Sequence, residues 1–187
     1  MAAGLAWLGG CGNALDDGSD PSGSIIRVVS VNPEPATAFT PDIFVDVCDA
    51  SADPPDTEPG IPNSYATVEM LNESRPNTPT GKSTNSFVTM SRYRVDFTGI
   101  NKTVNLPSLD GGGLSVGIAP DGTGTITVLV MDLPTLEYIR SHYPTIGTTE
   151  GLTLRADISI WGKDAFQADV KATAEVTLVI ENYDRCP

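Results

Sequence analysis

The chain has 187 residues and a formal net charge of −13, from 24 acidic and 11 basic side chains. That length suffices for one domain with a hydrophobic core of its own, and the acidic balance argues against binding to the phosphate backbone of nucleic acid, which needs clustered Lys and Arg. No apolar run reaches the length of about 18 residues that a transmembrane helix requires, so the sequence predicts no such helix.

The first eleven residues, MAAGLAWLGGC, hold a short apolar run that ends in Leu8-Gly9-Gly10-Cys11. This ending resembles the lipobox of bacterial lipoproteins, in which an aliphatic residue and two small residues precede the cysteine that receives the lipid. The resemblance implies a signal peptide remnant and lipobox at residues 1–11, lipidation of Cys11, and a location in the bacterial cell envelope. A signal peptide opens with Lys or Arg, whereas the first basic residue here is Arg27, so we expect the natural chain to begin upstream of Met1.

The three cysteines are Cys11, Cys48 and Cys186. If Cys11 carries lipid, an even pair remains, and disulfides persist in exported proteins. We therefore expect a Cys48–Cys186 disulfide, which would stabilise the fold by about 4–5 kcal/mol in the chain-entropy description; two buried free thiols are the alternative. No two cysteines have the spacing of a zinc-binding pair, so we expect neither a metal site nor a cofactor.

Residues 12–23 are rich in Gly, Ser, Asp, Asn and Pro, which predicts a flexible tether. Residues 24–187 are expected to form a single β-sandwich domain. In Ile25–Val31, β-branched residues occur at positions that would point to both faces of a strand. The segment therefore predicts a strand that is buried on both sides. Ile43–Cys48 predicts a second strand, and the acidic, Pro-rich residues 49–63 predict a long exposed loop.

Strict alternation of apolar and polar residues predicts antiparallel strands with one face in the core and one in water. Along residues 152–160 the inward positions are Leu152 and every second residue after it. The same pattern occurs in three other segments, which are Tyr65–Asn72, Arg92–Thr98 and Ala168–Ile180. Thr125–Met131 predicts a further strand, and weaker strands are expected near Val104 and Val116.

One short connecting helix is predicted after Asp132, which suits an N-cap, with Pro134 in the first turn and Pro144 beyond the end. Seven to nine short strands with one such helix predict an all-β antiparallel sandwich, immunoglobulin-like in the broad sense. The Cys-Trp-Cys hallmark of true immunoglobulin domains is missing, because Cys186 is the last residue but one.

Residues 113–117, GLSVG, match the G-x-S-x-G pattern of the nucleophile elbow in α/β-hydrolases, and Asp132 and His142 follow in the hydrolase order. The elbow needs a helix directly after the serine. The next residues, IAPDG, predict a turn, so a glycine-rich hairpin is favoured over a catalytic Ser115.

Acidic segments are a further candidate, because calcium takes six to eight oxygen ligands, often from such loops. Neither acidic segment has the spacing of an EF-hand, and solubility alone accounts for both. His142 is the only histidine and predicts a helix-end residue rather than a metal ligand. The acidic residues lie in the tether and in the long loop: Asp16, Asp17, Asp20, Asp49, Asp53, Asp56 and Glu58.

These patterns together favour a lipid-anchored cell-envelope protein, facing the periplasm or the cell surface, with a non-enzymatic sandwich that binds or scaffolds. Its expected partners are the membrane, through the lipid, and an envelope protein or a glycan. One alternative is a calcium- or glycan-binding module, for which exposed aromatic residues such as Tyr65 or Trp161 would matter. A second is a serine hydrolase using Ser115.

Overall fold

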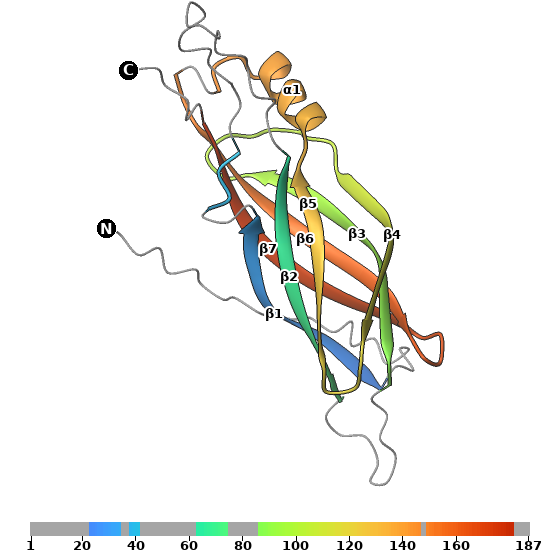
Figure 1. The fold of residues 1–187 in the computed structure, drawn as a ribbon. Coiled ribbons are helices and arrows are strands. Elements are labelled where there is room, and N and C mark those ends of the chain that lie inside the picture. The colour runs from blue at the N-terminus through green and yellow to red at the C-terminus, as the bar shows by residue number, and fades with distance from the viewer. Residues whose placement is uncertain (1–22, 35–37, 42–62, 75–85, 147–148, 182–187) are drawn as a thin grey trace, which may run out of the picture.

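The computed structural model describes residues 23–34, 38–41, 63–74, 86–146 and 149–181. These residues form seven β-strands and one α-helix (Figure 1). The elements are β1 (Ser24–Glu34), β2 (Ser64–Ser74), β3 (Val88–Gly99), β4 (Leu109–Ile118), β5 (Thr123–Met131), α1 (Leu133–His142), β6 (Leu152–Asp164) and β7 (Asp169–Ile180).

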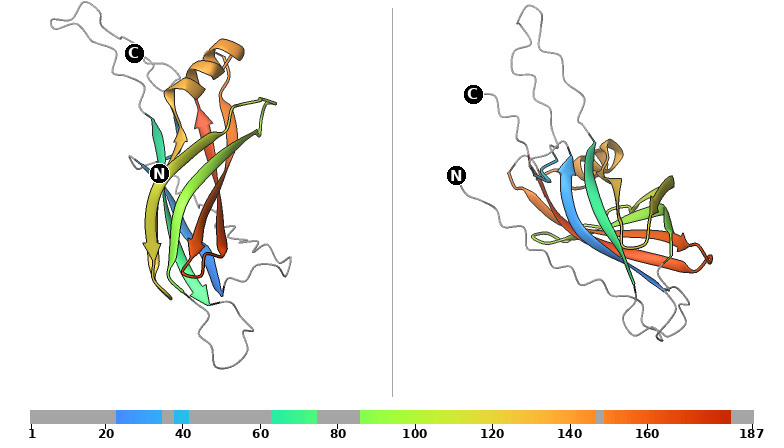
Figure 2. Two further views of the ribbon diagram at one scale, coloured as in Figure 1. Left: turned by 90° about the vertical axis from the view of Figure 1, so that its right-hand side faces the viewer. Right: turned by 60° about the horizontal axis from the view of Figure 1, so that its bottom comes forward.

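The strands form two antiparallel sheets, with the orders β1-β2-β5 and β4-β3-β6-β7. The sheets pack as two layers whose strands run at an angle to each other, with α1 at one end (Figure 1, Figure 2). If the strands are lettered A, B, C, C′, E, F and G in chain order, the sheets are A-B-E and C′-C-F-G, which is an immunoglobulin-like arrangement in the broad sense. The predicted all-β sandwich with one short helix is therefore confirmed.

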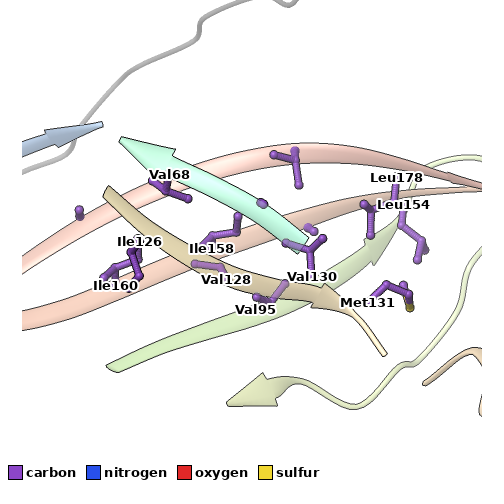
Figure 3. Close-up of a cluster of buried hydrophobic side chains, with 14 of the residues drawn as sticks. Val68, Val95, Ile126, Val128, Val130, Met131, Leu154, Ile158, Ile160 and Leu178 are labelled. Carbon is purple, nitrogen blue, oxygen red and sulfur yellow. The ribbon is translucent and has the colours of Figure 1, made fainter. Parts of the chain in front are cut away.

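The core lies between the two sheets and is built from the alternating segments (Figure 3). Every inward position predicted on β2 and β6 is buried, and the predicted inward positions of β7 are buried except Ala174, which is partly buried. Each buried Val, Leu or Ile contributes about 1.5–3 kcal/mol relative to exposure. Buried residues of β5, which neighbours β2 in the other sheet, face β6 and β7 across the core, namely Ile126, Val128 and Val130.

Tyr93 of β3 links the two sheets at the side where β4 and β5 form their edges. Its hydroxyl accepts a hydrogen bond from the Leu129 N–H of β5, at 3.1 Å. The ring occupies the place that a side chain at Gly111 would take, 2.1 Å from the position of a Cβ there. The absence of a side chain at Gly111 therefore lets Tyr93 cross β4 and reach β5.

The prediction for β1 is only partly right. The strand forms, but it lies at the edge of its sheet rather than buried on both sides. Ile26 is buried, whereas Arg27 is exposed and pairs with Glu73 of β2 at 2.8 Å. Val28 and Val31 are partly buried against the core. The β-branched composition of β1 correctly predicts its extended backbone. A sandwich of two sheets covers only one face of each strand, so β1 cannot be buried on both faces.

The strand expected near Val116 is β4, but the strand expected near Val104 does not form. Residues 100–108 connect β3 to β4, and the side chain of Asn101 takes the place of a strand partner. It donates to the Gly151 carbonyl and accepts from the Thr153 N–H, both at 2.9 Å. Val104 is partly buried and packs against the core without forming a strand.

Helix α1 forms as predicted. The Asp132 carboxylate accepts a hydrogen bond from the Thr135 N–H at 2.9 Å, which satisfies one of the free donors of the first turn. Leu136 and Ile139 are buried, so the helix closes one end of the core. Within the helical residues that the structure describes, no segment is long and apolar enough to cross a membrane.

Several expected features lie outside the described residues. They include most of the tether, the strand at Ile43–Cys48, nearly all of the acidic loop that follows it, and all three cysteines. The described part of the predicted domain 24–187 forms the sandwich.

Candidate functional site

The residues of the hydrolase pattern are held apart by their local structure. Ser115 lies in β4, and the chain continues through the tight turn 119–122 directly into β5, so no helix follows the serine. The Asp132 carboxylate caps α1. The ring of His142 stacks on Tyr138, and its Nδ1 lies 2.8 Å from the Ser141 hydroxyl. Among the described residues no hydrogen bond joins Ser115 to either, so the strand–turn–helix geometry of a nucleophile elbow is not formed.

A cluster of metal-binding side chains is likewise not found in the described ranges, where no group of three or more His, Cys, Asp or Glu residues comes together. The acidic residues 49–58 lie outside these ranges.

Basic side chains gather instead on the outer face of the four-stranded sheet, where the polar positions of the alternating strands point to solvent. This face carries five of the eleven basic residues of the chain. They are Arg92 and Arg94 on β3, Arg155 and Lys163 on β6, and Lys171 on β7.

Three of these five cations have carboxylate partners on the same face. Arg94 contacts Asp96 at 2.9 Å, Arg155 contacts Asp157 at 3.2 Å, and Lys163 contacts Asp169 at 3.0 Å. Exposed pairs of this kind contribute at most about 1 kcal/mol each, so their main effect is to neutralise the cations.

Arg92 and Lys171 are different, because neither makes an ion pair or hydrogen bond within the part of the chain that the structure describes. Both lie instead over the ring of Trp161. The Arg92 guanidinium carbon is 5.0 Å from the ring centroid and the Lys171 ammonium is 5.3 Å from it. The strand register explains the contact, since Trp161 of β6 is opposite Arg92 on one neighbouring strand and opposite Lys171 on the other. We call these three residues the Arg–Trp–Lys row.

Beside Arg92, at the edge of the sheet, lies a part of β4 that carries no side chains. Arg92 is paired with Gly112 of β4 on its far side. No atom lies within 4 Å of the place where a Cβ of Gly112 or Gly113 would be, so this part of β4 is open. The next row along the strands carries the hydroxyls of Ser159 and Thr173. The site is thus an indole between two cations, flanked by hydroxyls and open backbone.

Asp96 lies on the second row along the strands from the Arg–Trp–Lys row, opposite Asp157. The Ser108 hydroxyl donates to Asp96 at 2.6 Å, and this hydrogen bond, with that of Arg94, lowers the pKa of Asp96 below its usual value despite partial burial. Lys171 adds a smaller attraction in the same direction. Lys171 therefore interacts with the indole and, through its charge, with the Asp96 carboxylate.

The sequence indicated Trp161 as an aromatic residue of possible importance, but not its two partners. Arg92 and Lys171 lie 69 and 10 positions away from it, and only the strand register brings them together. Tyr65 lies on β2 in the other sheet, so the two aromatic residues do not form one platform. The available signal was a Trp at an outward position of a strongly alternating strand.

No protein-family model matches this sequence, and no curated protein matches it either.

Proposed function

We propose that this chain is a lipid-anchored protein of the bacterial cell envelope whose sandwich is a non-enzymatic binding module. The observation that carries the binding part is the Arg–Trp–Lys row: two cations without a carboxylate partner among the described residues, on either side of an indole. Trp and Arg dominate the energetics of binding surfaces. Such a cation can form charge-assisted hydrogen bonds with an anionic group of a ligand.

The envelope location is supported by Leu8-Gly9-Gly10-Cys11 and by the polar residues 12–23 that follow. A lipid on Cys11 would hold the sandwich at a membrane, and a tether of this composition would leave its outer face accessible. Single acylation anchors weakly, so stable attachment requires the multiple chains that a lipoprotein carries.

Expression of the full chain with its natural upstream sequence in a bacterium, with a labelled fatty acid in the medium, tests the anchor. The label should enter the protein and should be lost in Cys11→Ala, while Cys48→Ala keeps it. Mass spectrometry of the mature protein should find Cys11 as the first residue. An unmodified Cys11 with residues 1–10 still attached would contradict the anchor.

A further inference from the structure

We propose that the Arg–Trp–Lys row binds an acidic polysaccharide, specifically a chain of uronic acid residues. This inference rests on the proposed binding function and names its ligand class. Its starting point is which basic side chains form ion pairs with carboxylates and which do not. Five other basic residues that the structure describes form ion pairs with carboxylates, whereas Arg92 and Lys171 form none within the described ranges and lie over the indole of Trp161. The five are Arg27, Arg94, Lys102, Arg155 and Lys163.

The two cations lie on the two strands that flank Trp161, so a ligand that carries several anionic groups can reach both. Each cation lies within 5.3 Å of the same ring centroid, so the two charges are at most about 10 Å apart with the indole between them. A uronic acid chain carries one carboxylate per sugar and presents apolar C–H faces between them. A carboxylate can take both N–H groups of the Arg92 fork, and another can reach Lys171.

The surroundings of the row favour a sugar over other polyanions. The hydroxyls of Ser159 and Thr173, on the next row along the strands, offer hydrogen bonds to sugar hydroxyls. A ligand with a dense run of phosphates would need a continuous track of cations, whereas the row offers two. An anionic lipid surface likewise requires several more basic residues in one patch.

Open backbone beside Arg92 gives an extended ligand room to continue. Gly112 is paired with Arg92, and both Gly112 and Gly113 project no side chain into the space beside it. A chain that crosses the sheet from Lys171 over Trp161 to Arg92 therefore meets no obstruction on β4.

Binding of the full-length chain to polygalacturonate, measured by isothermal titration calorimetry at physiological salt, tests the proposal. Arg92→Gln and Lys171→Gln should each weaken binding by about tenfold or more, and Trp161→Ala should do the same. Lys163→Gln is the matched control, because it removes the same charge from the same face at a cation that already has a partner; its affinity should stay within about twofold. Trp161→Phe keeps an aromatic face and guards against a folding defect in Trp161→Ala.

Two further ligands distinguish recognition of the uronic acid carboxylates from recognition of the uncharged sugar backbone and of anionic lipid. Fully methyl-esterified polygalacturonate has the same backbone without charge and should bind at least about tenfold more weakly. Vesicles of phosphatidylglycerol should not bind in a manner that depends on Arg92 and Lys171. The proposal is overturned by absence of polygalacturonate binding, by equal binding of the ester, by an equal effect of Lys163→Gln, or by vesicle binding that the row variants abolish. A failed lipid-labelling experiment would leave these results unaffected, so the two proposals fail separately.

Discussion

Gly162 lies on β6 opposite the bulge that interrupts β3 between Met90 and Arg92. A Cβ at this position would be 2.2 Å from the Thr89 carbonyl oxygen and 2.8 Å from the Met90 Cα, and both are backbone atoms. A close-packed interior cannot move backbone aside at little cost. We therefore expect Gly162→Ala to lower the free energy of unfolding by about 2–3 kcal/mol, measured by urea denaturation followed by circular dichroism.

Gly112→Ala is the control for this prediction. It makes the same change in a strand of the same sheet, but nothing lies within 4 Å of the new Cβ. Its free energy of unfolding should stay within about 0.5 kcal/mol of the parent. Equal losses in the two variants would show that strand glycines matter here through backbone flexibility rather than through the close approach at Gly162.

At the scale of elements, Asp164 organises the turn between β6 and β7. The residue is 3% exposed, and its Oδ1 accepts hydrogen bonds from the Phe166 and Ala168 N–H groups at 2.8 and 2.9 Å. Asp164→Ala removes the acceptor for both donors and should cost about 1–3 kcal/mol. Asp164→Asn keeps one acceptor oxygen and should lose less. Thermal melts of both variants check the order, and an equal loss would mean that the carboxylate charge matters more than the two hydrogen bonds.

The contact between Asp96 of β3 and Ser108, just before β4, makes stability depend on pH. The hydrogen bonds from Ser108 and Arg94 hold the pKa of Asp96 below its usual value. A carboxyl with a lowered pKa in the folded state stabilises above its unfolded pKa of about 3.9 and loses this contribution as the pH falls through its folded pKa. Asp96→Asn should therefore be less stable than the parent at pH 7, and the difference should shrink at pH 3.

Urea denaturation at the two pH values measures this difference. Ser108→Ala removes the larger hydrogen bond and leaves the carboxyl in place, so it should show a smaller loss with the same direction of pH dependence. A difference between Asp96→Asn and the parent that stays constant from pH 7 to pH 3 would rule out the titration of Asp96 as its cause.

For the whole molecule, the sequence predicts which face of each strand is buried better than it predicts which strands pair. Alternation along β6 and β7 is a local property, and burial of one face follows from it directly. The edge position of β1 and the lack of a strand at Val104 depend on which strands pair, which is a non-local property. The candidate site has the same origin, because Arg92, Trp161 and Lys171 become neighbours only through the register of three strands. Trp161 alone carried a local signal.

The predicted Cys48–Cys186 disulfide is also a property of the whole molecule, because it would join an early segment to the carboxyl-terminal strand. Both cysteines lie outside the described residues, but the chain near them is placed. The Val179 N–H of β7 donates to the Phe39 carbonyl at 2.9 Å. Phe39 precedes Cys48 by nine residues and Val179 precedes Cys186 by seven. Two segments of similar length therefore start from hydrogen-bonded residues. Their lengths are compatible with a disulfide between the two cysteines.

If the bridge forms, it restricts the unfolded chain far more than the folded one, because its loop includes most of the domain. Reduction of the full-length protein should therefore lower its melting temperature while the far-ultraviolet circular dichroism at room temperature stays unchanged, since β2, β3, β5 and β6 carry the core without either cysteine. Cys48→Ser should reproduce the lower melting temperature and abolish its response to reductant. Cys11→Ser should keep both the parent melting temperature and the response. A parent protein whose melting temperature is insensitive to reductant, with two titratable thiols after unfolding, would show that Cys48 and Cys186 are free.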